Sequence, residues 1–155
     1  QVIKLTSTQL DSLVNRAYNL AVIKDQYHKK YNGADYKATA YEYDGLAKIL
    51  TDAQLNAWLI YRNKKTAKNN ALRLWAEMEA KNITQGVDAQ KAHEELMAYE
   101  LKRITSSLKY QIKKSTENAK LRKMAQYEKP LLLIKLQETK DLTATNQALK
   151  RKMAW

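Results

Sequence analysis

The sequence contains no cysteine, no phenylalanine, one proline and three glycines among its 155 residues. The absence of cysteine excludes disulfides, thiolate catalysis and metal sites built on thiolates. Because tight turns and hairpins depend on glycine and proline, their scarcity argues against a protein made of several short strands. We therefore expect an all-α protein, an elongated bundle of long amphipathic helices.

Long apolar runs are missing as well. The longest candidate, "PLLLIKL" from Pro130 to Leu136, is far shorter than the roughly 18 apolar residues of a membrane-spanning helix, so we expect no membrane insertion. The chain begins with Gln1, which suits a secreted protein whose signal peptide has been removed. A hydrophobic content of 45% at this length favours a real core, and we expect a single all-helical domain over residues 1–155.

Apolar residues recur at three- and four-residue steps over most of the chain, which is the pattern of amphipathic helices. The breaks are Asn32-Gly33, the loop "NITQG" from Asn82 to Gly86, and Pro130, which lacks the N–H that a helix interior needs. The expected helices cover residues 6–31, 35–49, 51–82, 88–129, 131–140 and 143–155.

Two short stretches share one pattern, "LTSTQL" from Leu5 to Leu10 and "LTDAQL" from Leu50 to Leu55. Threonine followed three residues later by glutamine is a capping box, in which each side chain bonds the backbone N–H of the other residue at a helix start. Leucines just before the cap and four residues into the helix form a hydrophobic staple. Both stretches therefore predict helix starts, and the motif residues are Leu5, Thr6, Gln9, Leu50, Thr51 and Gln54.

This pair of motifs, with a tyrosine- and lysine-rich segment between them, resembles the LTxxQ family of bacterial periplasmic proteins of the Spy and CpxP type. The most similar stretch is "LAKILTDAQLNAWLIYRNKK", from Leu46 to Lys65. The resemblance covers about residues 5–80, and the helices expected over about 88–155 are an additional C-terminal half. It implies an all-helical fold, commonly an antiparallel homodimer shaped like a shallow cradle. It also implies a periplasmic ATP-independent chaperone or envelope-stress protein whose partners are unfolded or envelope proteins.

Charge is the second informative feature. The chain has 28 basic and 16 acidic residues, a formal net charge of +12. The excess concentrates between Leu101 and Lys129, where a basic helical face would attract acidic unfolded chains or polyanions. Lysines on a helix surface are also often merely solvated. The candidate client-binding residues are Lys102, Arg103, Lys109, Lys113, Lys114, Lys120, Arg122 and Lys123.

Nucleic-acid binding is the alternative from another class, because basic helices meet its electrostatic requirement. No helix-turn-helix spacing, zinc ligands or aromatic RNA-binding signature accompanies the charge. A structural or interaction protein of the cell envelope shares every feature with the chaperone. Tyrosines gather around the Asn32-Gly33 turn, at Tyr27, Tyr31, Tyr36, Tyr41 and Tyr43, and suit either the boundary of a bundle or contact with flexible chains.

Residues for catalysis are hard to find. The sequence has two histidines, no HExxH motif, no glycine-rich phosphate loop and no nucleophile with a recognisable base. His93 and Met97 lie four residues apart on an expected helix and could both face one metal ion, as in a metal-sensing relative of the LTxxQ family. Two ligands are too few for zinc, which requires three or four. We expect no enzyme activity, no cofactor and no metal.

Overall fold

The computed structural model describes residues 3–32 and 45–153, and these residues form helices and no strand. The prediction of an all-α fold is therefore confirmed for the described residues. Their helices are α1 (Ser7–Lys30), α3 (Leu46–Ile49), α4 (Asp52–Glu79), α5 (Ala89–Ile112), α6 (Thr116–Tyr127) and α7 (Leu131–Met153).

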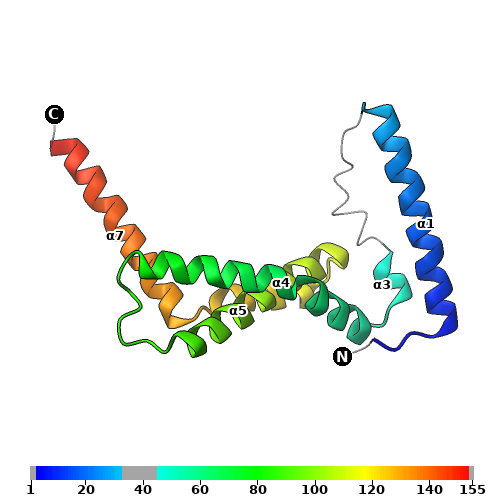
Figure 1. Cartoon of the computed structure of the whole chain (residues 1–155), viewed down its shortest axis with the longest axis horizontal. Coiled ribbons are helices and arrows are strands. Elements are labelled where there is room, and N and C mark those ends of the chain that lie inside the picture. The colour runs from blue at the N-terminus through cyan, green and yellow to red at the C-terminus, as the bar shows by residue number, and fades with distance from the viewer. Residues whose placement is uncertain (1–2, 33–44, 154–155) are drawn as a thin grey trace.

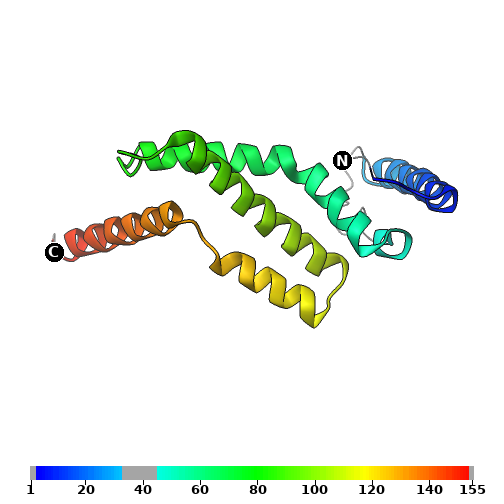
Figure 2. The same ribbon diagram turned by 90° about the horizontal axis from the view of Figure 1, so that it is seen from below.

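The molecule is elongated, with α4 and α5 lying side by side along its middle (Figures 1 and 2). Helix α6 returns along α5, and α1 and α7 stand at opposite ends of the body. In Figure 1 both end helices rise to the same side, which gives the chain the outline of an open cradle. The expected elongated helical architecture thus arises within one chain.

Two separate apolar clusters hold the body together. The first joins the C-terminal half of α4 to α5 and α7 and includes Trp75, Met78, Leu96 and Leu136. The second joins α3 to the N-terminal half of α4 and contains Leu46, Leu50, Leu55 and Leu59. The buried residues of α4 lie at intervals of three, four or eight residues, which places them on one face of the helix, so this one helix contributes to both clusters.

Small and polar residues fill the interface of α4 and α5 between the two clusters. Ala67 on α4 is buried, and so are Glu100, Thr105 and Ser106 on α5. The two hydroxyl groups donate to backbone carbonyls of their own helix, which satisfies them without a partner on α4. Leu72, in contrast, is exposed on α4.

The helix expected over 88–129 is two helices. Helix α5 ends at Ile112, Lys113 adopts an extended conformation, and Ser115 caps α6 by accepting a hydrogen bond from the Asn118 N–H. Asn118 secures the corner by donating from Nδ2 to the Lys113 carbonyl at 2.9 Å. These hydrogen bonds satisfy a backbone N–H at the start of α6 and a backbone carbonyl after the end of α5, groups that have no partner within a helix.

The C-terminal segment is also corrected. Residues 131–140 and 143–155, expected as two helices, belong to one continuous helix over the described residues, α7. Pro130 ends the preceding segment as expected, and its carbonyl accepts the first bonds of α7 from Leu133 and Ile134. Leu136 and an ion pair of Lys140 with Glu77, at 2.7 Å, attach α7 to the body, and residues 141–151 are exposed.

The predicted bounds of the N-terminal helix, residues 6–31, are confirmed. Helix α1 begins after Thr6, and the hydrogen bond from the Tyr31 N–H to the Tyr27 carbonyl closes its last turn. The helix expected over 35–49 falls mostly outside the described residues, and its described end is α3. Glycine is required at the start of α3, since Gly45 has a φ of +77°.

Candidate functional site

Both repeated motifs form the capping boxes that the sequence predicts. The Thr6 hydroxyl oxygen accepts from the Gln9 N–H at 3.2 Å, and the Gln9 Oε1 accepts from the Thr6 N–H at 3.1 Å. The corresponding distances at Thr51 and Gln54 are 3.2 and 2.9 Å. Each box therefore fixes the first turn of a long helix, α1 or α4.

The two boxes also contact each other, which the sequence did not indicate. The Gln9 Nε2 donates to Gln54 Oε1 at 2.9 Å, and the Gln54 Nε2 donates to Gln9 Oε1 at 3.1 Å. The second N–H of each amide goes to the backbone just before the other motif, from Gln9 to the Ile49 carbonyl and from Gln54 to the Lys4 carbonyl. We call this reciprocal set of bonds the motif junction. It attaches the start of α1 to the start of α4.

The motif leucines differ in burial. Leu50 and Leu55 both belong to the buried cluster at this end of the molecule, as the predicted staple requires. Leu5 and Leu10 are exposed, with Leu10 at 53%. The first staple is therefore not buried, and the hydrogen bonds of the motif junction attach this helix start to the start of α4.

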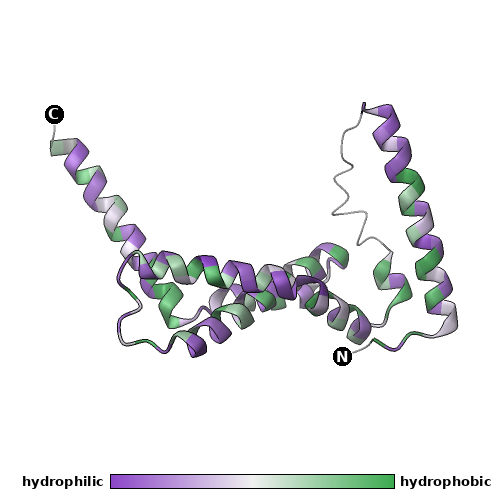
Figure 3. Ribbon diagram, viewed as in Figure 1, coloured by the Kyte–Doolittle hydropathy of each residue, from purple (hydrophilic) through white to green (hydrophobic). Residues whose placement is uncertain are grey.

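Helix α1 lies against the body without burying a single residue completely. Leu13 packs against the cluster of α3 and α4, whereas other large apolar residues of α1 are exposed. Figure 3 shows hydrophobic positions alternating with hydrophilic ones along this helix. Four of the exposed apolar residues recur at every fourth position and are between 37 and 70% exposed. This α1 stripe consists of Leu10, Val14, Tyr18 and Val22.

Some residues of the predicted basic face have partners within the chain, and others are exposed without one among the described residues. Lys102 is paired with Glu128, which follows the last residue of α6, and Arg103 is paired with the buried Glu100 at 2.8 Å. The Arg122 guanidinium lies 4.4 Å from the centroid of the Tyr110 ring, a cation–π contact between α5 and α6. Three members of the predicted client-binding set thus have structural contacts.

Lys109 and Lys113 line a cleft of about 310 Å³ between α4, α5 and α6. Asp52 and Glu117 line the same cleft, so its positive and negative charges are balanced. The exposed Lys114, Lys120 and Lys123 are the members of the predicted set that, among the described residues, have no ion pair, make no cation–π contact and do not line the cleft. The accessible basic surface is therefore centred on α6 and the corner before it.

Glu100 is the one acidic residue buried among the described residues. Burial raises the pKa of its carboxyl group, but hydrogen bonds from Arg103 and from Asn70 of α4 stabilise the carboxylate, and the net pKa lies below its ordinary value. The Asn70 Nδ2 is 2.8 Å from Glu100 Oε2. This polar bridge fixes how α4 and α5 align, and sequence periodicity did not reveal it.

His93 packs beside Trp75. Its ring lies 4.9 Å from the Trp75 ring, and its Nε2 is buried without a hydrogen-bond partner. No group of three potential ligands for a metal ion occurs within residues 3–32 and 45–153. Of the predicted tyrosine cluster, Tyr27 and Tyr31 are in contact, with ring centroids 4.4 Å apart and ring planes tilted by 41°. Tyr36, Tyr41 and Tyr43 lie outside the described residues.

Comparisons with protein-family models, with curated proteins and with solved structures gave no match to this chain. The resemblance to the LTxxQ family therefore rests on the two motifs and their spacing. None of the described helices is both long and apolar enough to cross a membrane.

Proposed function

We propose that this chain is a periplasmic, ATP-independent chaperone-like or envelope-stress protein that binds unfolded or partner proteins and is not an enzyme. The observation that carries the proposal is the α1 stripe, in which Leu10, Val14, Tyr18 and Val22 face solvent on a helix with no buried residue. Clustered apolar surface on a soluble protein commonly marks a site of protein interaction. A helix with this stripe suits contact with apolar segments of many sequences.

Charge supports the same proposal. The net charge of +12 and the accessible lysines on α6 attract acidic chains over about 8–10 Å at ordinary ionic strength. Electrostatic attraction of this kind accelerates encounter more than it strengthens the final complex. Lys114, Lys120 and Lys123 would therefore recruit clients, and the α1 stripe would hold them.

The periplasmic location and the kind of client follow from the family resemblance. The motif junction supports that resemblance, because it gives the repeated Leu-Thr-x-x-Gln pattern a joint role in one structure. A second copy covering the α1 stripe, as the homodimers of the family imply, is the alternative occupant. Sedimentation across a range of protein concentrations separates a stable homodimer from a monomer that captures clients.

The central test measures light scattering by a denatured model protein diluted into buffer with and without this chain. The Val14→Ser, Tyr18→Ser double variant should lose most of the suppression of aggregation, because it removes two exposed apolar contacts. The Asn15→Ser, Asn19→Ser double variant is the matched control, since both asparagines are exposed on the same helix and lie outside the stripe. Full suppression by the Val14 and Tyr18 variant would refute the role of the stripe.

Salt separates this proposal from nucleic-acid binding. Reversing Lys114, Lys120 and Lys123 to Glu should slow capture, whereas suppression by the unaltered chain should persist at high salt because apolar burial is not screened. A nucleic-acid binder would instead lose affinity with a log–log slope of roughly −0.9 per phosphate contacted on duplex DNA. Tight DNA or RNA binding at physiological salt, with no effect on aggregation, would replace the proposed function.

A further inference from the structure

The cleft of about 310 Å³ between α4, α5 and α6 is lined by four charged side chains. Asp52 and Glu117 lie in the first turns of α4 and α6. Lys109 lies in the last turn of α5, and Lys113 directly follows that helix. None of the four side chains forms an ion pair or a hydrogen bond with another described residue. The cleft therefore presents two cations and two anions that have no partner in the described part of the chain.

The corner between α5 and α6 holds these charges in place. Asn118, which also lines the cleft, donates from Nδ2 to the Lys113 carbonyl at 2.9 Å and to the Lys109 carbonyl at 3.4 Å. Ser115 lies between them in the chain and caps α6. Because the backbone that carries both lysines and Glu117 is already ordered, a ligand has to order only side chains when it binds.

Two leucines give the cleft an apolar wall. Leu55 is 5% exposed and belongs to the cluster of α3 and α4, whereas Leu121 of α6 is 41% exposed. A ligand with an apolar group would remove part of Leu121 from water, which is favourable. The cleft thus combines charges of both signs with an apolar surface.

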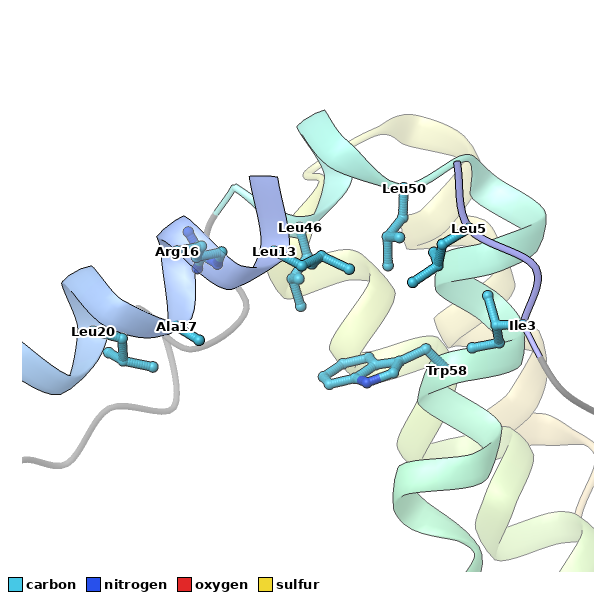
Figure 4. A pocket seen from close by; sticks show the side chains of 9 residues that line it. All are labelled: Ile3, Leu5, Leu13, Arg16, Ala17, Leu20, Leu46, Leu50 and Trp58. Carbon is cyan, nitrogen blue, oxygen red and sulfur yellow. The ribbon is translucent and has the colours of Figure 1, made fainter. Parts of the chain in front are cut away.

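The apolar pocket beside the motif junction has a different character. Its volume is about 240 Å³, and its wall includes Leu13 and Leu20 of α1, Leu50 of the second motif and Trp58 of α4 (Figure 4). Arg16 is the one charged residue among its described wall residues, and it already has an interaction partner. The described walls of this pocket therefore offer a ligand no free charge.

The two signs of charge in the cleft select its ligand. A simple anion near the lysines would also be repelled by the carboxylates, and a simple cation would be repelled by the lysines. A free amino acid carries an ammonium group and a carboxylate on one carbon atom, so it can face both pairs at once. At about 30 Å³ for each water-sized group, the cleft corresponds to about ten such groups, which suits a molecule of the size of leucine.

We propose that the cleft binds a free α-amino acid with an apolar side chain. The ligand carboxylate accepts hydrogen bonds from Lys109 and Lys113. Its ammonium group donates to Asp52 and Glu117, and its side chain packs on Leu121. The inference is independent of client binding, because it requires neither the α1 stripe nor the exposed lysines of α6.

Nuclear magnetic resonance titration of the isotopically labelled whole chain with leucine tests the proposal. Leucine should bind with a Kd on the order of 1 mM, as expected for so small a ligand. Glycine, N-acetylleucine and leucinamide lack, in turn, the side chain, the ammonium charge and the carboxylate, and each should bind at least about fivefold more weakly. No saturable shift at about 10 mM leucine, or equal affinity of leucine and N-acetylleucine, would overturn the proposal. Tighter binding of leucylleucine than of leucine would also overturn it, because the cleft would then be a site for peptide termini.

Two double variants test the cationic side of the cleft. The Lys109→Gln, Lys113→Gln variant should weaken leucine binding at least about fivefold and remove the preference for leucine over leucinamide. The Lys120→Gln, Lys123→Gln variant removes the same charge from α6 outside the cleft and should change neither. Equal effects of the two variants would refute a role for the cleft lysines.

Single substitutions test the anionic side and the location. Glu117→Gln should narrow the preference for leucine over N-acetylleucine at least about threefold, because the ammonium group loses one of its two carboxylates. Glu95→Gln, exposed on α5 and not lining the cleft, should preserve that preference. Ala17→Leu adds volume to the wall of the apolar pocket and should leave binding unchanged. Leucine binding that survives the cleft variants and disappears in Ala17→Leu would place the ligand in that pocket and refute this site, even if the chain also suppresses aggregation.

Discussion

The side-chain amides of Gln9 and Gln54, 45 residues apart in the chain, donate hydrogen bonds to each other's oxygen. Each amide also accepts from the threonine N–H of its own motif and donates to the backbone before the other motif. Both N–H donors and the oxygen of each amide are therefore satisfied by partners from the two motifs together. One copy of the motif can cap a helix, but two are needed to bond α1 to α4.

Gln54→Glu separates these two roles. A glutamate at this position of a capping box still accepts from the Thr51 N–H, but it cannot donate to Lys4 or Gln9. We expect the free energy of unfolding in urea to fall by about 1–3 kcal/mol, because polar groups of the junction lose their donors.

Gln90→Glu is the control for the substitution at Gln54, since Gln90 lies in the first turn of α5 and bonds only within that helix. Its effect should stay within about 0.5 kcal/mol. A second check is the combination of Gln9→Ala with Gln54→Ala. The two losses should be non-additive by at least about 0.5 kcal/mol, and strict additivity would show that the two amides are not energetically coupled.

Glu100 makes the stability of the α4 and α5 pair depend on pH. Because its pKa in the folded chain lies below the ordinary value of 4.5, the carboxylate stabilises the fold above that pH and loses this contribution as pH falls through the lowered pKa. Glu100→Gln should cost about 1.5–3 kcal/mol at pH 7, and its difference from the unaltered chain should shrink toward pH 3. Thermal unfolding across this range measures both, with the exposed Glu95→Gln as control. A difference independent of pH would contradict the role of the charge.

Leu136 should contribute most of the attachment of α7. Its side chain is 2% exposed within the cluster of Trp75 and Leu96, so Leu136→Ala should destabilise the chain by about 2–5 kcal/mol. Leu142→Ala removes the same atoms from a position that is 66% exposed, and it should change stability by no more than about 0.5 kcal/mol. Equal effects in chemical denaturation would indicate that α7 is not anchored through Leu136.

His93 should be replaceable by an apolar ring. Because its Nε2 is buried without a partner beside Trp75, His93→Phe removes a polar atom whose desolvation is not compensated. We expect unchanged stability or a gain of up to about 1 kcal/mol, and melting temperatures that are the same in zinc and in chelator. A large zinc-dependent stabilisation that disappears in His93→Phe would instead establish a metal role.

Helix starts were predictable because they depend on residues close in sequence. Thr6 with Gln9 and Thr51 with Gln54 carry their own hydrogen-bond partners, and the structure forms both boxes. The start of α6 had a similar local signal, since Ser115 is a good N-cap and Glu117 places a negative charge in the first turn. Continuous apolar periodicity across 88–129 obscured that signal.

The rest depends on contacts that no local pattern contains. Gln9 meets Gln54 only after the chain has folded back, and Asn70 bonds Glu100 across two helices. The ion pair of Lys102 was not predictable for the same reason, because Glu128 is distant in sequence, and Asp52 and Glu117, which share the cleft of Lys109, come from other helices. The pocket beside the junction likewise required three segments to be placed in space.

Helix α1, which has no buried residue, should unfold locally more readily than the central helices. A helix with no buried residue opens by local unfolding at a lower free energy than α4 and α5, whose Leu59 and Leu96 are completely enclosed. Its amide hydrogens should therefore exchange with solvent deuterium well before those of the central pair. Any partner that covers α1 would slow the exchange of this helix selectively. The rate at which α1 takes up deuterium would therefore show whether a partner is bound to α1, with no dye or tag attached to the chain.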